Sequence, residues 1–227
     1  MSKLILVPTP IDDESPLEPI ALEELNKAVT DSNSIIAVED AKPGRRRWLN
    51  WGLPREAIEN FVLYNEHTRN EQLELLLAEL KNGKSVYLMS DGGLPAFCDP
   101  GQELVDACHE RGITVTATPF CNSIALAIAL SGFCHKQFLF SGFLPAKKDL
   151  REQEWQRILK NNFTQVLMDT PYRLSKTMEE LSSLSPQKKV FLALNLNQAN
   201  EALFRGKAKD LYKKVKDLKA EFILIIF

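Results

Sequence analysis

An acidic, glycine-rich stretch at residues 90–101 (SDGGLPAFCDPG) carries the residues best suited to chemistry. Asp91 is the second residue of the stretch, directly after a predicted strand, and Gly92 and Gly93 follow it. A carboxylate or nearby amides at a strand end could meet a polar ligand, and glycines allow the backbone to approach it closely. Asp91 is therefore a candidate site residue. The alternative is a well-formed loop that binds nothing.

A second candidate group is the pair Glu66 and His67. An imidazole titrates near neutral pH, so His67 could act as a general base or as a ligand, with Glu66 beside it. A lone histidine is more often a polar packing residue, and both interpretations stay open. No cluster of His, Cys, Asp and Glu has the spacing of a metal site, so we expect no metal.

Three consecutive arginines, Arg45, Arg46 and Arg47, form a third candidate group, with Trp48 and Trp51 close by. Guanidinium groups contact phosphates and indole rings stack on bases, so this segment suits RNA. The alternative is a solvated surface loop whose tryptophans pack locally. A net charge of −2 over 227 residues neither indicates nor excludes a nucleic-acid partner.

Short apolar runs alternating with helical patterns must position these residues, and they predict an α/β fold. The expected strands are 4–7, 34–38, 61–64, 85–89 and 113–117 in the first half, and 138–140, 165–168, 190–194 and 222–227 in the second. The first set predicts a mostly parallel sheet, and the second a sheet that could be mixed. We expect two α/β domains, residues 1–117 and 118–227.

Strand ends in a parallel sheet should bring distant loops together. The carboxyl ends of parallel strands lie at one edge, so loops 7–13, 90–101 and 118–123 are expected to converge on one crevice, where open α/β sheets bind nucleotide-like ligands. The loops lack GxGxxG and GxxxxGK[ST], which argues against both phosphate-binding mechanisms. We also expect Asp99 to cap the following helix.

The four cysteines lack CxxC spacing, which predicts buried thiols in a reducing compartment. The apolar run at residues 4–7 is too short for a signal peptide, and the run 124–130 is too short to span a bilayer. These features predict a cytoplasmic protein without membrane contact.

Several motifs, in one order along almost the whole chain, resemble those of the tetrapyrrole-methylase superfamily. Within it, they resemble the bacterial small-subunit ribosomal RNA 2′-O-ribose methyltransferases that act on a cytidine. The matching stretches are 8–11 (family TPIGN), 39–40 (EDTR), 64–67 (YHEH), 90–101 (SDAGTPxISDPG), 131–132 with 138–148 (SGLP…FxFxGFLPxKK), 169–173 (ESPHR) and 205–206 (RG).

This resemblance implies an S-adenosylmethionine-dependent methyltransferase with two α/β domains of the tetrapyrrole-methylase type. It further implies a cofactor site in the cleft between the domains, a homodimer, and RNA of the small ribosomal subunit as the substrate. Asp91, Glu66 and His67 are then the candidates for activating a ribose hydroxyl, and Arg45–Arg47 for holding RNA phosphates. The implied cofactor-binding residues are Thr9, Asp91, Gly92, Gly93, Leu94, Pro95, Phe120, Asn122, Ser123 and Ile124, followed by Phe143, Met168, Leu194 and Asn195.

The chain departs from the family pattern at three places. Asp12 and Asp13 replace a glycine and an asparagine, Phe120 replaces a glycine, and segment 192–198 lacks the charged pair of the family's ARELTK. Two alternatives therefore stay open. One is a methyltransferase for a tetrapyrrole or another non-RNA substrate, and the other is a paralogue that binds a ligand without catalysis.

Overall fold

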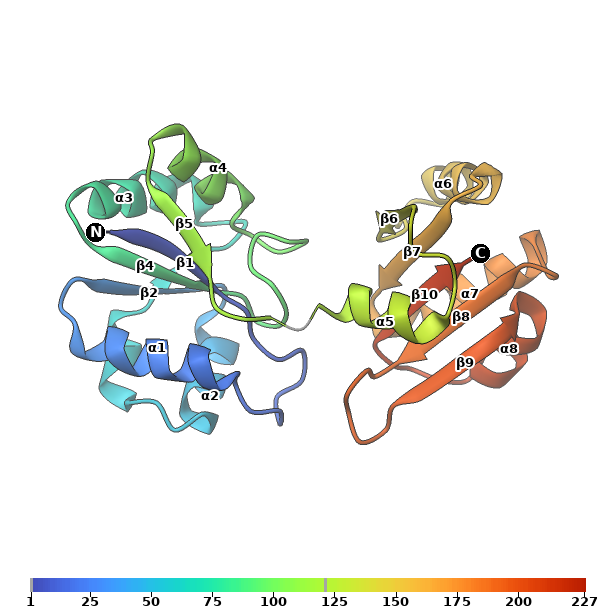
Figure 1. Cartoon of the computed structure of the whole chain (residues 1–227), viewed down its shortest axis with the longest axis horizontal. Helices are drawn as coiled ribbons and strands as arrows, with labels where there is room; N and C mark the ends of the chain where they lie inside the picture. Colours follow the sequence, from blue (N-terminus) through green and yellow to red (C-terminus); the bar gives the residue numbers. More distant parts are fainter. Residues whose placement is uncertain (1, 121) are drawn as a thin grey trace. The chain divides into compact units, whose positions relative to one another are not determined.

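The computed structural model describes residues 2–120 and 122–227. The chain folds into two compact units, Met1–Phe120 (unit 1) and Cys121–Phe227 (unit 2). Each unit is built around its own five-stranded sheet (Figure 1). We describe each unit by itself.

Unit 1 is a parallel sheet covered on both faces by helices (Figure 1). One face packs against α1, α2 and the short 3₁₀ helix η1, and the other against α3 and α4. Because both faces are covered, the three inner strands are mostly apolar runs, as the sequence predicted, whereas the edge strand Thr114–Ala117 is largely exposed. In sheet order the strands are β3 (Val62–Leu63), β2 (Ser34–Val38), β4 (Ser85–Met89), β1 (Lys3–Val7) and β5 (Thr114–Ala117). The helices are α1 (Pro19–Thr30), α2 (Ala41–Asn50), η1 (Arg55–Asn60), α3 (Arg69–Lys81) and α4 (Gln102–Glu110).

Unit 2 has a mixed sheet, in which β6 and β7 are parallel and the other pairs are antiparallel. Helices α6, α7 and α8 cover one face, and α5 packs on the other. In sheet order the strands are β6 (Phe138–Gly142), β7 (Thr164–Asp169), β10 (Phe222–Ile226), β8 (Lys189–Leu194) and β9 (Ala202–Lys207). The helices are α5 (Ser123–Ser131), α6 (Lys148–Lys160), the 3₁₀ helix η2 (Pro171–Arg173), α7 (Leu174–Leu184) and α8 (Ala208–Val215).

The loop alternative for the arginine-rich segment is wrong, because residues Ala41–Asn50 form helix α2. Asp40 caps this helix by accepting a hydrogen bond from the Lys42 amide at 2.9 Å. Trp48 is fully buried, its Nε1 donates to the Pro54 carbonyl at 2.8 Å, and its ring meets Phe61 edge-on. The Trp48 ring is therefore a core element of unit 1 and has no free face for a base.

The expected cap at Asp99 is also wrong. Helix α4 begins at Gln102, and its N-cap is Gly101 at φ +133°. A Cβ at Gly101 would lie 2.8 Å from Leu88 Cδ2, so the close passage over β4 requires glycine at this point. Asp99 lies two residues before Gly101 and does not cap α4.

Three of the four cysteines are free thiols in the described part of the chain. Cys108 is buried as expected, whereas Cys98 and Cys134 are exposed, so the prediction of buried thiols is wrong for these two. Cys121 lies outside the described residues. Among residues 2–120 and 122–227, no helix is long and apolar enough to cross a bilayer.

Candidate functional site

The loops that follow β1 and β4 are joined by their backbones. The Thr9 amide donates to the Gly93 carbonyl at 2.8 Å, and the Gly93 amide donates back to the Thr9 carbonyl at 3.0 Å. Thr9 Oγ1 also donates to the Ser90 carbonyl at 3.1 Å. On the other side of β1, the Thr118 amide donates to the Leu6 carbonyl at 3.0 Å. The predicted convergence of the β1 and β4 loops is confirmed, and the third loop starts beside them.

Glycine is needed where these two loops touch. A Cβ at Gly92 would lie 3.4 Å from the Ile11 carbonyl oxygen, and Gly93 has φ +100°. Ala96 and Cys98 also have positive φ, at 64° and 67°, although they are not glycines. Such conformations are costly for residues with a Cβ and mark a loop that its surroundings hold in shape. The loop therefore offers a fixed backbone surface that a flat ligand could approach.

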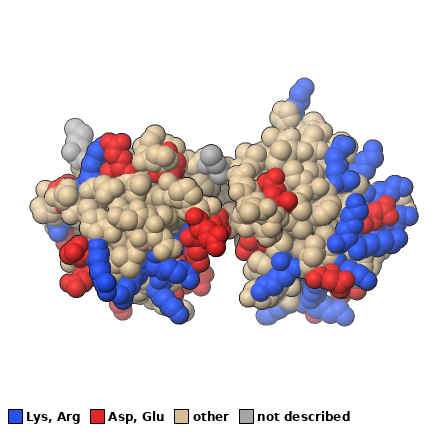
Figure 2. All heavy atoms as spheres, turned by 90° about the horizontal axis from the view of Figure 1, so that it is seen from below, with Lys and Arg blue, Asp and Glu red and all other residues tan. Residues whose placement is uncertain are grey.

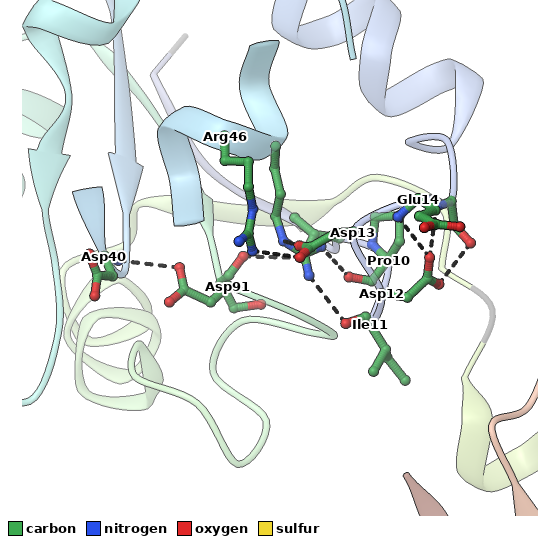
Figure 3. A network of polar contacts seen from close by, with 12 residues as sticks. Pro10, Ile11, Asp12, Asp13, Glu14, Asp40, Arg46 and Asp91 are labelled. Carbon is green, nitrogen blue, oxygen red and sulfur yellow. Dashed lines mark hydrogen bonds and ion pairs between the residues drawn. The ribbon is translucent and has the colours of Figure 1, made fainter. Parts of the chain in front are cut away.

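Three carboxyl groups gather at this edge of the sheet. The Asp91 amide donates to Glu39 Oε2 at 3.0 Å, and Asp91 Oδ1 accepts from the Asp40 amide at 3.3 Å (Figure 3). Burial, followed by the charge of Glu39, raises the pKa of Asp91 to about 6. The same two causes raise the pKa of Asp99 to about 6. At neutral pH the edge therefore carries concentrated negative charge, which favours a cationic ligand.

Glu39 and Asp99 were not among the predicted site residues. Glu39 directly follows the buried strand β2, just as the β4 loop follows β4. That placement was a usable signal, because the carboxyl ends of parallel strands share an edge.

Arg47 holds the β1 loop in place. Its side chain is 7% exposed, and its guanidinium donates to the carbonyls of Pro10 and Ile11, the latter at 3.1 Å. Its Nε lies 3.2 Å from Asp13 Oδ1, and Arg46 Nη2 lies 2.6 Å from Asp13 Oδ2. Figure 3 shows Asp13 facing Arg46 of α2, with Pro10 and Ile11 in the same network of polar contacts. Both Nη atoms of Arg47 are thus occupied within unit 1, whereas Arg45 is exposed and Arg46 is half exposed.

The two aspartates that depart from the family pattern have structural partners. Asp12 Oδ1 accepts from the amides of Glu14 at 2.9 Å and Ser15 at 2.7 Å, and Asp12 Oδ2 accepts from Ser15 Oγ. Asp13 pairs with Arg46 and Arg47, as described above. Asp12 therefore stabilises the turn after β1 with side-chain hydrogen bonds that glycine could not make, and Asp13 adds a charge that pairs with the arginines of α2.

Glu66 and His67 lie at the same sheet edge, after β3, with β2 between their strand and β4. Both side chains are exposed. Asn65 fixes the turn, because its Oδ1 accepts from the His67 amide at 2.9 Å and its Nδ2 donates to the Glu39 carbonyl at 3.0 Å. The turn is thus tied to the acidic group, and the catalytic roles of Glu66 and His67 stay predictions.

The other predicted cofactor residues are divided between the β4 loop, the end of unit 1 and the start of unit 2. Leu94 and Pro95 belong to the β4 loop, and Phe120, 37% exposed, ends unit 1. In unit 2, Ser123 and Ile124 begin α5, and Asn122 caps this helix by accepting from the amides of Ile124 at 2.9 Å and Ala125 at 3.0 Å.

Unit 2 also gathers predicted residues at one end of its sheet. Strands β7 and β8 both run antiparallel to β10, so they run in the same direction, and their ends Asp169 and Leu194 both face Phe222 of β10. Asn195, at φ +46°, follows Leu194, and its Oδ1 accepts from the Glu221 amide at 3.1 Å. Met168 lies in β7, and Phe143 follows β6, which runs parallel to β7.

A buried polar network that the sequence did not reveal supports this end of unit 2. Arg151 of α6 is 3% exposed, with Nε 2.7 Å from Glu180 Oε2, Nη2 2.8 Å from Thr177 Oγ1 and Nη1 3.6 Å from Asp169 Oδ2. Arg173 Nη1 approaches Asp169 Oδ1 at 3.3 Å. This network anchors α6 and α7 to the end of β7. Among residues 2–120 and 122–227, no group of His, Cys, Asp and Glu is arranged to hold a metal ion.

Comparison with known families decides the identity of this arrangement. The model of the family described as Tetrapyrrole (Corrin/Porphyrin) Methylases matches residues 3–212. The chain belongs to the tetrapyrrole methylase family. It is a methyltransferase, as predicted, and the family as a whole implies S-adenosylmethionine as the methyl donor.

Relatives and solved structures agree with this assignment. The chain is 32% identical over 229 residues to "Ribosomal RNA small subunit methyltransferase I" of Synechocystis sp., covering 100% of this chain and 79% of the relative. It is 31% identical over 210 residues to the protein of the same name from Thermotoga maritima, covering 92% and 90% of the two chains. Among solved structures, a diphthine synthase matches with TM-score 0.66 at 12% identity, covering 100% of this chain and 90% of that one. A cobalt precorrin-4 methyltransferase matches with TM-score 0.57 at 15% identity, covering 99% and 94%. The predicted family and fold are confirmed.

Proposed function

We propose that this tetrapyrrole methylase family member transfers a methyl group from S-adenosylmethionine to RNA of the small ribosomal subunit, at the 2′-hydroxyl of a ribose. The observation that carries the choice of RNA is the match of the whole chain to relatives named as small subunit ribosomal RNA methyltransferases. Those names do not favour the tetrapyrrole-substrate or non-catalytic alternatives. The proposal includes a cytoplasmic location, where ribosomal subunits occur, and assembly as a homodimer.

The β1 and β4 loops of unit 1 fit the cofactor. Gly92 packs against Ile11 of the β1 loop, and Gly93 at φ +100° turns the β4 loop in a way that a side chain would resist. Glu39, Asp91 and Asp99 attract positive charge, which S-adenosylmethionine carries on its sulfonium and ammonium groups. Phe120 and Ile11 are partly exposed and supply apolar surface for an adenine.

When bound, the cofactor supplies an electrophilic methyl group. The task of the chain is to align a ribose hydroxyl with that group and to accept the hydroxyl proton, and positioning alone can lower a barrier by about 7–11 kcal/mol in favourable cases. The candidates for accepting the proton stay Asp91, Glu66 and His67. A carboxylate whose pKa is raised to about 6 is a stronger base than an ordinary one, which supports Asp91. Arg45 and Arg46 stay predicted phosphate contacts, and Phe143, Met168, Leu194 and Asn195 stay predicted cofactor contacts.

Methyl transfer to isolated ribosomal subunits tests the proposal. We expect radiolabel from S-adenosylmethionine in the RNA of small subunits taken from cells that lack this protein, and no label in large subunits. Nuclease mapping should place the label on a ribose 2′-oxygen. Tight cofactor binding with no label in small-subunit RNA, whether in subunits or deproteinised, would contradict the proposal.

Cofactor affinity should rise with pH between 5 and 7. Asp91 and Asp99 have pKa values of about 6, so they must lose protons before they can attract the sulfonium cation. Linkage then predicts that, below pH 6, each carboxyl raises the cofactor affinity by up to about tenfold per pH unit. Above pH 6 the affinity should level off. Calorimetry at several pH values, in buffers that differ in ionisation enthalpy, measures both the affinity and the protons released.

Two controls separate this effect from general pH sensitivity. S-adenosylhomocysteine lacks the sulfonium charge and should show a flatter profile. Asp91→Asn keeps an oxygen acceptor for the Asp40 amide and should also flatten the profile. Equal profiles for the two ligands, or an affinity that falls as pH rises, would show that these carboxyls do not face the cationic part of the cofactor.

A further inference from the structure

The net charge of −2 hides a strong asymmetry between the two units. Unit 2 has 17 Lys and Arg against 10 Asp and Glu, whereas unit 1 has 11 against 20. The units therefore carry net charges of +7 and −9. An RNA backbone is attracted to positive surface, so electrostatics favours unit 2 over the Arg45–Arg47 segment of unit 1. Figure 2 shows Lys and Arg gathering on the right-hand unit, which is unit 2.

Eight of the 17 basic residues of unit 2 lie on one helix or beside its ends. Strand β8 starts beside the end of β9, where Lys189 faces Lys207 in the strand register, and the Ala208 amide at the start of α8 donates to the Lys188 carbonyl at 3.0 Å. Lysines then continue along α8 and the turn after it. We call this set the α8 lysine track: Lys188, Lys189, Lys207, Lys209, Lys213, Lys214, Lys216 and Lys219.

The lysines of the track are without ion-pair partners among the residues that the structure describes. In the described part of unit 2, the ion pairs within 4.0 Å involve Lys148, Arg151, Arg157 and Arg173, and none of the track lysines. Asp210 and Asp217 are the acidic residues within segment 207–219. Like charges held opposite each other, as at Lys189 and Lys207, destabilise a sheet, and a bound polyanion would relieve that repulsion.

The track also leads toward the end of the sheet where the predicted unit 2 site residues lie. Helix α8 has eight residues and spans about 12 Å. Beyond it, Lys219 Nζ lies 3.7 Å from the centre of the Tyr172 ring, three residues after the end of β7 at Asp169. Tyr172 is 78% exposed, so the face of its ring that Lys219 does not cover offers a surface on which a base can stack.

We infer that the α8 lysine track binds the phosphate backbone of the RNA substrate, with a base stacked on Tyr172 where the track meets the end of β7. This inference rests on the proposed function. The contacts to phosphates are independent of RNA sequence and set affinity and orientation, and the stacked base adds a contact that salt does not screen.

A charge-reversal variant tests the track. Lys207→Glu, Lys213→Glu and Lys216→Glu change three exposed track lysines in the full-length protein. The matched control, Lys3→Glu, Lys81→Glu and Lys160→Glu, changes three exposed lysines elsewhere and alters the net charge equally. Affinity for deproteinised small-subunit RNA is measured at several salt concentrations, with thermal melting to confirm that both variants fold.

We expect the track variant to bind RNA at least tenfold more weakly, with a salt slope lower by about 2, because each phosphate contact contributes roughly 0.7–0.9 to that slope. The KM for RNA should rise while cofactor affinity stays constant. Tyr172→Ala should weaken RNA binding at least fivefold and leave the salt slope unchanged.

The outcomes separate this inference from the proposed function. Equal effects of the two triple variants would show that only net charge matters and would overturn the inference, as would an unchanged KM and salt slope in the track variant. A wild-type protein that binds RNA through the track but methylates none would overturn the proposed function alone. A wild-type protein that binds no RNA would overturn both.

Discussion

Replacing Arg47 with alanine is expected to lower the free energy of unfolding of unit 1 by about 3 kcal/mol. The guanidinium donates to two loop carbonyls and lies against Asp13, and its side chain is nearly inaccessible. Removing one partner of a buried hydrogen bond costs roughly 1–3 kcal/mol for each group left unpaired, and here two carbonyls lose their donor. Hydrogen exchange of peptides from residues 8–15, together with urea unfolding, measures the loss.

Arg46→Ala is the matched control, because Arg46 contacts the same Asp13 from an exposed position. An exposed ion pair contributes less than about 1 kcal/mol, so the free energy of unfolding of this variant should be close to that of the wild type. Arg47→Lys should not restore stability, because an ammonium group cannot reproduce the fork that contacts two carbonyls and a carboxylate. Equal losses for Arg46→Ala and Arg47→Ala would mean that Asp13, not the loop carbonyls, is the important partner.

The Arg47 variant should also weaken cofactor binding. The loop that Arg47 holds lies against Gly92, so a displaced Ile11 would alter the backbone surface of residues 91–95. Calorimetry at a temperature where the variant is folded separates this effect from global unfolding.

Replacing Arg151 with alanine is expected to destabilise unit 2 by about 3–5 kcal/mol. The change leaves Glu180, 25% exposed, without its cationic partner, and it leaves Asp169, 2% exposed, with Arg173 alone. A buried carboxylate that loses its partner is far more costly than an exposed one. Urea unfolding followed by the fluorescence of Trp155 reports on this region, because Trp155 Nε1 donates to the same Glu180 at 2.8 Å.

The control for Arg151 lies on the same helix. Arg157 pairs with Glu154 at an exposed position, and Arg157→Ala should cost less than about 1 kcal/mol. The triple variant Arg151→Met, Asp169→Asn and Glu180→Gln should recover much of the lost stability, because it removes the uncompensated charges while retaining volume. No recovery in the triple variant would show that packing, rather than charge, explains the loss.

The sequence was most informative where burial is extensive. Strands β1, β2 and β4 are apolar after their first residues, Lys3, Ser34 and Ser85, and the predicted runs match them closely. Strand β9 was missed because Leu203, Arg205 and Lys207 alternate with partly buried residues at the edge of the sheet, so no apolar run marks it. Helix α2 was missed because Pro43 and Gly44 suggest a turn, whereas Pro43 fits the first turn of a helix and Gly44 packs closely on Val38.

The site was predictable in outline because it depends on topology. Parallel strands place the β1 and β4 loops at one edge, and this follows from strand order alone. The side chains that support the site were not predictable, because arginines are mostly exposed and nothing local distinguishes Arg47 from Arg45 or Arg151 from Arg157. Their burial arises from packing between elements far apart in the chain. The lysine track was hidden for a different reason, since its charge stands out only once the two units are separated.

The reciprocal hydrogen bonds between Thr9 and Gly93 join two turns from distant parts of the chain, so that the two turns move together. Neither turn can swing outward without breaking both bonds and carrying the other with it. An insertion or deletion in one turn must therefore be matched by a compensating change of length in the other, so the two segments are bound to evolve as a pair.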